Sequence, residues 1–325
     1  MIKLTLNESK RKPWSWTKKN LKRAADIEAV LSELKEYWPM TIRHVFYRLI
    51  SSDRINQKHW EKSDGERPNV YDILSPLMKW MRIHDKIPME SITDEHRILT
   101  EKVGFTDPED FVMYQLGRLG KGYLRCNAQK QNRYVEVWIE KATLLHVVEP
   151  IADEFCRRVV VCKGYGSVTF QAQFYERAME AIGYGQVPTV LYFGDWDPSG
   201  VNMIHAAMET IQEELGLTGV DFFRCGINPE HFSEIPADPV PLKPSDTRTK
   251  AFVQDHGETA YELDAFHPRR LQELVRESLI EVTDMQSYVE QLAMQNEDLG
   301  VIDAWRKDVA DVAAEYAIHH GVVKV

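Results

Sequence analysis

The sequence has few cysteines and no long hydrophobic run. Its four cysteines match no zinc-ligand spacing and are too sparse for a disulfide scaffold. No apolar run approaches the ~18 residues of a membrane-spanning helix, and the basic N-terminus is not followed by the apolar stretch of a secretory signal. These absences predict a soluble, cytoplasmic protein with reduced thiols that contacts no membrane.

The chain also lacks a phosphate-binding loop of the form GxxxxGK[ST] and any internal repeat. Its net charge of -10 argues against binding to nucleic acid, but the charge is unevenly distributed. Residues 1–23 carry eight Lys/Arg against one acid, whereas residues 271–325 carry eleven Asp/Glu against four Lys/Arg. Because screening acts over roughly 8 Å, a distant acidic tail does little to cancel a basic segment. A solvated N-terminal arm is the plainer alternative.

The N-terminal third predicts a winged-helix domain over residues 1–105. Apolar periodicity predicts three helices, at residues 20–36, 41–51 and 70–83. Thr41 is expected to cap the second helix, and Pro76 to break the third. The segment 86–98 contains short strand-like pieces, which would form the wing.

The rest of the chain predicts an α/β domain. A helical connector over 106–133 leads to a region, 134–325, in which strand and helix patterns alternate before a helical extension. The expected strands are 135–140, 158–164, 189–195 and 221–227, with helices at 143–155, 168–182 and 200–215 between them. This alternation indicates a mainly parallel sheet flanked by helices, whose ligands bind beyond the carboxyl ends of the strands.

Three acids lie where such a sheet binds ligands. Glu140 ends the first expected strand and Asp195 ends the third, with Asp197 two residues further on in the stretch YFGDWDPSG. Two carboxylates about 4 Å apart repel by roughly 4 kcal/mol at an effective dielectric of 20, so a cation is expected between them. Oxygen ligands that leave room for a phosphate favour Mg²⁺. The alternative is that Asp195 and Asp197 only form a turn that caps the next helix.

The residues of these motifs resemble those of the Toprim fold, which topoisomerases, primases and some nucleases share. VWIEKATL supplies the glutamate, FGDWDPSG supplies the Asp-x-Asp, and KGYGS lies between them. The closest resemblance is to the topoisomerase VI A subunit and the related meiotic double-strand-break proteins, in particular the short stand-alone group called Mini-A. Gly166 stands where that family has a proline.

The resemblance also implies a catalytic tyrosine in the winged-helix domain. The family pattern Thr-x-Arg-x-x-aromatic-Tyr is matched by TIRHVFY, with Arg43 and Tyr47 in the key places. Tyr47 lies off the predicted buried stripe of its helix, which predicts an exposed side chain, and Arg43 is one turn away on the same face. A free phenol is only about one part in a thousand ionised at pH 7, so the nucleophile needs a base or cation nearby. The alternative is a tyrosine that packs against its own helix.

Several other residues are weaker candidates. His44 could contact phosphate, although a packing role is the plainer interpretation. In YELDAFHP (261–268), Glu262 and Asp264 could support the metal site or be surface acids before a helix. DNA-binding candidates are Lys79, Arg82 and Lys163.

The sequence therefore predicts a Mg²⁺-dependent, type IIB topoisomerase-like enzyme. It would cleave double-stranded DNA by transesterification through Tyr47. The resemblance implies a homodimer, in which the tyrosine of one copy meets the metal of the other, and a separate ATPase subunit for strand passage. Two alternatives stay open: a Toprim nuclease that uses water, and a non-enzymatic winged-helix DNA-binding protein. The sequence does not indicate DNA sequence preference or biological setting.

Overall fold

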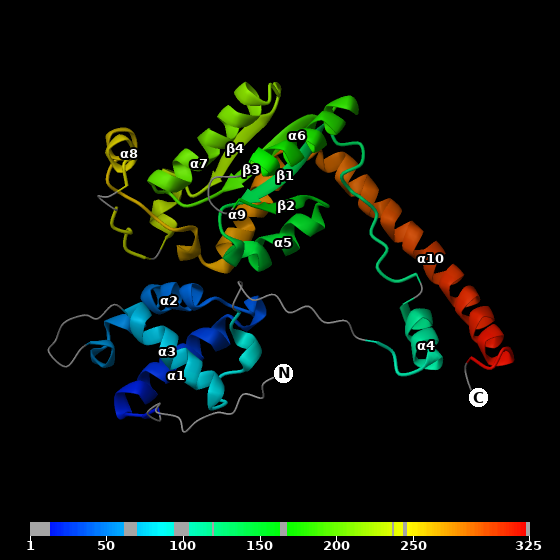
Figure 1. The fold of residues 1–325 in the computed structure, drawn as a ribbon, viewed down its shortest axis with the longest axis horizontal. Helices are drawn as coiled ribbons and strands as arrows, with labels where there is room; N and C mark the ends of the chain where they lie inside the picture. Colours follow the sequence, from blue (N-terminus) through cyan, green and yellow to red (C-terminus); the bar gives the residue numbers. More distant parts are fainter. Residues whose placement is uncertain are drawn as a thin grey trace, which may run out of the picture. The chain divides into compact units, whose positions relative to one another are not determined.

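A computed structural model describes residues 14–61, 70–93, 104–118, 120–162, 168–235, 237–242 and 246–322 of the 325. The chain divides into two compact units that each combine distant segments (Figure 1). The first, called here the tyrosine unit, contains residues 1–94, 195–198 and 227–271. The second, the sheet unit, contains residues 95–194, 199–226 and 272–325.

Three helices form the core of the tyrosine unit: α1 (Lys18–Glu33), α2 (Ile42–Ser51) and α3 (Val70–Ile83). Each predicted helix is therefore confirmed. Thr41 caps α2 as expected, because its hydroxyl oxygen accepts a hydrogen bond from the backbone N–H of His44 at 3.2 Å. The predicted break at Pro76 is wrong, since α3 runs through that residue. Apolar side chains from all three helices fill one core, including Ile27, Leu31, Val45, Leu49, Leu74, Leu77 and Met78.

The wing expected over residues 86–98 is not found in the part of that segment that the structure describes, which ends at residue 93. Here the chain forms a short 3₁₀ helix, Met89–Ser91, and a single parallel bridge between Ile92 and Met40. The winged-helix assignment therefore stays a prediction, while the three-helix core is established.

Two later segments complete the tyrosine unit. The Asp195–Pro198 segment pairs with the chain near residue 261 through an isolated antiparallel bridge between Trp196 and Tyr261, with N···O distances of 2.9 and 3.0 Å. The remaining elements are the 3₁₀ helices Pro229–Glu234 and Leu263–Ala265, the helix α8 (Thr249–His256) and the start of α9 (Pro268–Glu281). Residues more than 140 positions after α2 thus belong to the same compact body.

The sheet unit contains four parallel strands in the order β2-β1-β3-β4. Their bounds are Arg133–Ile139 (β1), Arg158–Val161 (β2), Val187–Phe193 (β3) and Asp221–Gly226 (β4). The helices between and after them are α5 (Leu145–Glu154), α6 (Val168–Gly183), α7 (Pro198–Glu209, followed by a π turn over Thr210–Glu214) and α10 (Met285–His319). The parallel α/β prediction is confirmed. Within the predicted connector, α4 (Pro108–Arg118) is helical, and the chain after it forms turns and extended backbone.

Helices cover both faces of the sheet. On one face, side chains of the sheet form a hydrophobic cluster with side chains of α6 and α7. The cluster includes Trp138, Val190 and Tyr192 of the sheet, Phe174 of α6 and Met203 of α7. Figure 1 shows α5 and α9 on the opposite face, where Gln272 of α9 donates to the Val147 carbonyl at 3.2 Å. The order of strands places β1 beside β3, where the connections diverge to opposite edges. This is the position at which open α/β sheets bind ligands.

Candidate active site

Tyr47 is the centre of a polar cluster within the tyrosine unit. Its hydroxyl donates a hydrogen bond to Oε2 of Glu262 at 3.0 Å. The side chain is only 7% exposed, so the expectation of an exposed tyrosine is wrong. The reason is that the 3₁₀ helix over 263–265 packs against α2, an approach that the periodicity of α2 alone does not reveal.

Arg43 is the third member of the cluster formed by Tyr47 and Glu262. One turn before Tyr47, it places Nη1 3.2 Å from the same Oε2 of Glu262, and its side chain is 44% exposed. Burial alone would lower the pKa of Arg43, but the negative charges of Glu262 and Asp264, with Tyr47 and Asp195, raise it above its ordinary value. Arg43 therefore stays a cation whose open side can meet an anion.

The segment 262–265 is held in place from two directions. The backbone N–H of Leu263 donates to Oδ1 of Asp195 at 2.7 Å, which ties the first acid of the Asp-x-Asp motif to the residue after Glu262. Arg48 of α2 donates to the Ala265 carbonyl at 3.3 Å. Burial lowers the pKa of Arg48 to about 10. These contacts fix the carboxylate of Glu262 beside the phenol.

His44 and Asp264 form a second, deeper pair. Nε2 of His44 lies 3.4 Å from Oδ1 of Asp264, and both side chains are almost completely buried. The packing interpretation of His44 agrees with this burial. The alternative that Glu262 and Asp264 are surface acids is wrong for Asp264, because the 3₁₀ helix 263–265 packs on α2 and Asp264 is buried.

The three predicted metal ligands, Glu140, Asp195 and Asp197, each follow the end of a strand. Glu140 directly follows β1 in the sheet unit, where its backbone N–H donates to the Phe193 carbonyl at 2.9 Å and its Oε2 accepts from Tyr192 at 3.3 Å. Asp195 is buried and Asp197 half-buried, both in the tyrosine unit. Since β3 ends at Phe193, the aspartates follow the strand that lies next to β1.

The donor chemistry of these residues fits Mg²⁺, because all three are carboxylates. Among the described residues, no group of three His, Cys, Asp or Glu side chains forms a metal cluster in the structure. The magnesium site stays a prediction.

Two of the three predicted DNA-binding residues, Lys79 and Arg82, lie on α3. Lys79 is exposed on α3 with its ammonium group 5.5 Å from the ring centre of Trp80, and Arg82 is half-buried one turn later. Trp80 also stacks on Trp14 at 6.0 Å, so this face combines cations with aromatic rings. Lys163 lies outside the described residues.

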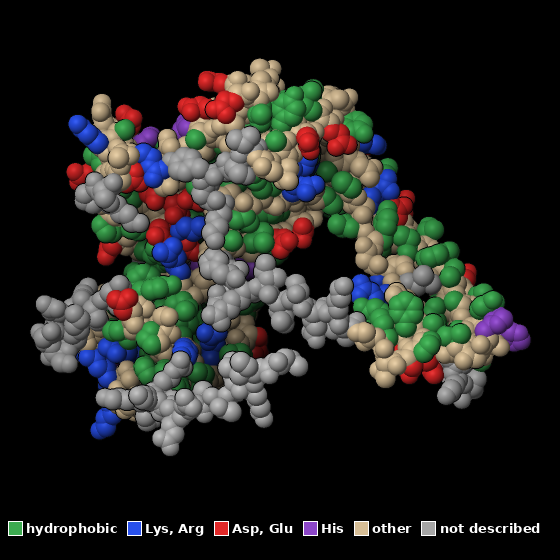
Figure 2. Space-filling view, in the orientation of Figure 1, with side chains coloured by type: hydrophobic (Ala, Val, Ile, Leu, Met, Phe, Trp, Pro, Cys, Tyr) green, Lys and Arg blue, Asp and Glu red, His purple; other side chains and the backbone are tan. Residues whose placement is uncertain are grey.

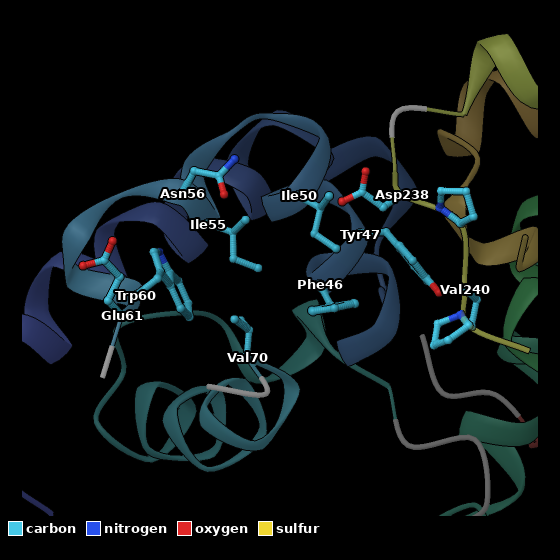
Figure 3. A pocket seen from close by; sticks show the side chains of 12 residues that line it. Phe46, Tyr47, Ile50, Ile55, Asn56, Trp60, Glu61, Val70, Asp238 and Val240 are labelled. Carbon is cyan, nitrogen blue, oxygen red and sulfur yellow. The ribbon is translucent and has the colours of Figure 1, made fainter. Parts of the chain in front are cut away.

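A pocket of about 400 Å³ borders Tyr47 within the tyrosine unit (Figure 3). Its walls are largely apolar, with Phe46, Ile50, Ile55 and Trp60 on one side and the 238–241 segment on the other. In Figure 3, Tyr47 lies at the edge of the pocket that faces Val240. A buried tyrosine thus still borders open space.

Comparison with known proteins adds no constraint: no family model, curated protein or solved structure matches the chain. Within the described part of the chain, no helix combines the length and apolar character that a membrane span requires.

Of the residues in this cluster, the sequence predicted Tyr47, Arg43 and Asp195 as site residues and offered Glu262 as a weaker candidate, but gave no indication of Arg48. The available signal was YELDAF itself. It interleaves two acids with apolar residues, which is an unusual pattern for a solvated turn.

Proposed function

We propose that the protein cleaves double-stranded DNA by transesterification through Tyr47. The observation that carries this proposal is the hydrogen bond from the Tyr47 hydroxyl to the Glu262 carboxylate, with the Arg43 guanidinium on the same oxygen. A phenol, a carboxylate that can accept its proton and a cation that can hold a phosphate are the groups that a tyrosine nucleophile needs. The TIRHVFY and GDWDPSG motifs add the resemblance to the topoisomerase VI A family.

The proposed reaction exchanges one phosphodiester bond for another. The Tyr47 oxygen attacks a backbone phosphorus while Glu262 takes its proton. The bond from phosphorus to the 3′-oxygen breaks, and that oxygen leaves as a hydroxyl after taking a proton from water. The product is a 5′-phosphotyrosyl link. Arg43, whose guanidinium is partly exposed, pairs with a non-bridging phosphate oxygen.

A magnesium ion held by Glu140, Asp195 and Asp197 would neutralise charge that develops on the phosphate and the leaving oxygen. Asp195 has a second task in this proposal, because its contact with Leu263 holds the residue next to Glu262. Each chain offers one Tyr47, so cutting both strands of a duplex would take two copies. Strand passage would need a separate ATPase, since the chain has no phosphate-binding loop.

A second candidate is a nuclease that uses water in place of Tyr47. The observation that favours it is the burial of Tyr47, which is 7% exposed and already engaged with Glu262. This enzyme would need the same carboxylates, with no covalent intermediate.

One assay separates the two candidates. Supercoiled plasmid is incubated with the full chain and Mg²⁺, the reaction is stopped with denaturant, and DNA bound to protein is measured. The proposal predicts protein-linked 5′ ends that disappear in Tyr47→Phe and in EDTA. Nicking with free ends that persists in Tyr47→Phe would establish the nuclease. Plasmid that stays intact at all Mg²⁺ concentrations would reject both enzymes.

A further inference from the structure

The chain between α4 and β1 brings one cysteine beside a second cysteine that follows α5. This part of the chain lies along α10 (Figure 1), where Figure 2 shows many hydrophobic side chains. The thiol of Cys156 donates to the carbonyl oxygen of Arg125, with 3.7 Å between sulfur and oxygen. Nδ2 of Asn127 donates to the carbonyl oxygen of Glu154 at 2.6 Å. Cys126, which is exposed, lies between these two contacts, so each of two neighbouring segments carries a thiol.

The two thiols differ in their surroundings. Burial raises the pKa of the half-buried Cys156 thiol, although the backbone N–H of Asn127 acts in the opposite direction. The side chain of Cys126 also acts on this thiol and raises its pKa further. Since the thiolate is the reactive form and the reagent must also reach it, Cys126 is the thiol that reacts first with a molecule from solution. Cys156 is placed to react with Cys126 afterwards.

A buried cation lies beside these thiols. Arg157 is only 6% exposed, and its Nε is buried with no hydrogen-bond partner in the part of the chain that the structure describes. Burial lowers the pKa of Arg157, and the charges that raise it are those of Cys126 and Cys156. A buried cation is costly without an anion, and an ionised sulfur supplies one. Arg157 therefore favours the thiolate form that disulfide chemistry needs.

The end of α5 holds Cys156 in an unusual backbone conformation. Its φ of 50° lies in the left-handed region, where glycine is the usual residue after a helix. Its N–H donates to the Asp153 carbonyl at 2.9 Å, and the N–H of Arg157 continues the turn with a bond of 2.9 Å to the Ala152 carbonyl. Strained residues concentrate at functional sites, and here the strained residue carries the thiol.

We propose that Cys126 and Cys156 form a redox-active dithiol, which low-molecular-weight disulfides such as glutathione disulfide oxidise to an intramolecular disulfide. The bond would join the chain before β1 to the end of α5. The other two cysteines react more slowly, because Cys162 is buried and burial raises the pKa of Cys225 to about 11. The proposal is independent of the cleavage chemistry, because both thiols belong to the sheet unit and Tyr47 to the tyrosine unit.

The oxidation takes two exchange steps. Cys126, as the thiolate, attacks one sulfur of glutathione disulfide, and one glutathione leaves as a thiolate that takes up a proton. The Cys156 thiol then loses its proton to water and attacks the Cys126 sulfur, which releases the second glutathione. The protein loses two electrons and two protons, which reduce the reagent to two molecules of glutathione.

The test treats the reduced full chain with glutathione disulfide under native, mildly alkaline conditions. Free thiols are counted after denaturation, and the link is located by mass spectrometry of peptides that have not been reduced. The four free thiols of the wild type should fall to two, with a single cross-link between Cys126 and Cys156. Dithiothreitol should restore all four.

Serine variants separate the two steps. Cys156→Ser should stop after the first step and accumulate a mixed disulfide between glutathione and Cys126. Cys126→Ser should form neither a cross-link nor a glutathione adduct in the same time, because Cys156 is shielded. The matched control is Cys225→Ser, which should form the cross-link at the wild-type rate.

The role of Arg157 has its own readout, which is the pH dependence of the reaction. Without the cation the thiols ionise at higher pH, so Arg157→Met should slow the cross-link by about 10-fold near neutral pH and move the rise of the rate to higher pH. Arg157→Lys should keep most of the wild-type rate. Circular dichroism checks that both variants fold, and the cysteine variants decide the main proposal without them.

Three results would overturn the proposal. One is a wild-type chain that keeps four free thiols in excess glutathione disulfide. Another is a cross-link that joins other cysteines or forms only between copies. The third is equal loss of the cross-link in Cys225→Ser. A wild-type pH profile in a folded Arg157→Met variant would remove Arg157 from the site.

Discussion

Two carboxylates with restricted access to water, one in each unit, allow a structural acid to be compared with the acid proposed to accept a proton in catalysis. Glu136 in the middle of β1 is fully buried, and Arg177 donates to both of its oxygens at 2.6 and 3.2 Å. Tyr134 and Trp138 also donate to it. Burial and the neighbouring Glu136 charge raise the pKa of Tyr134 to about 12. The many donors around Glu136 give it a structural role.

Glu262 in the tyrosine unit has a different environment. Its side chain is 19% exposed, its neighbours include a phenol and a partly exposed guanidinium, and it lies next to a residue tied to Asp195. The half-buried Arg177 therefore neutralises the buried Glu136, whereas Glu262 contacts a phenol that borders a pocket. The two acids also differ in the exposure of the arginine that each contacts, which is 44% for Arg43 beside Glu262 and 24% for Arg177 beside Glu136.

The largest expected effect comes from breaking the structural pair. Arg177→Ala leaves the Glu136 carboxylate buried without its bidentate partner, and should lower the free energy of unfolding by about 3–5 kcal/mol. Urea unfolding followed by circular dichroism measures this. Arg158→Ala is the matched control, because Arg158 is 59% exposed and its Nε lies 3.9 Å from Glu136, so its loss should change stability by less than about 1 kcal/mol. Equal effects of the two substitutions would contradict the assigned role of Arg177.

Removing Glu262, the proposed proton acceptor, should affect cleavage more than stability. Glu262→Gln keeps the shape and a polar contact with Tyr47 but cannot take its proton, so formation of the covalent DNA adduct should fall about 10²–10⁴-fold. The free energy of unfolding should change by only about 1 kcal/mol. Plasmid cleavage and urea unfolding of the same preparation measure both quantities. Cleavage at the wild-type rate in this variant would remove Glu262 from the mechanism and leave Tyr47 to be judged by its own substitution.

The buried pair behind the site should contribute an intermediate amount of stability. His44→Ala removes one partner of the buried Asp264 and should cost about 1–3 kcal/mol in the free energy of unfolding. His205→Ala, an exposed histidine on α7, serves as the control and should change stability by less than about 0.5 kcal/mol. If His44→Ala proved as stable as the wild type, the pair would have no structural role.

The smallest effect is expected at the predicted DNA-binding face. Lys79→Ala should weaken binding of a duplex by about 1 kcal/mol or less and reduce the slope of log affinity against log salt by about one. Fluorescence anisotropy with a labelled duplex at several salt concentrations measures both. Lys250→Ala, on α8, is the control for loss of a surface lysine and should leave the slope unchanged. An unchanged slope for Lys79→Ala would place the DNA elsewhere.

The sequence by itself determined the local structure and the order of the motifs. Apolar periodicity is a property of neighbouring residues, so it predicted the three N-terminal helices, the four parallel strands and the Thr41 cap. It also placed Glu140 at the end of the first strand and Asp195 at the end of the third, and the structure ends these strands slightly earlier, at Ile139 and Phe193.

Only the tertiary structure decided what surrounds Tyr47. The 262–265 segment lies more than 210 residues after Tyr47. Its packing on α2 buries the tyrosine, brings Glu262 to the hydroxyl and places Asp264 against His44. Periodicity in α2 identifies one buried face, but a second face is buried by whatever distant segment packs on it. No local pattern carries that information, because burial depends on contacts between residues that are remote in the chain.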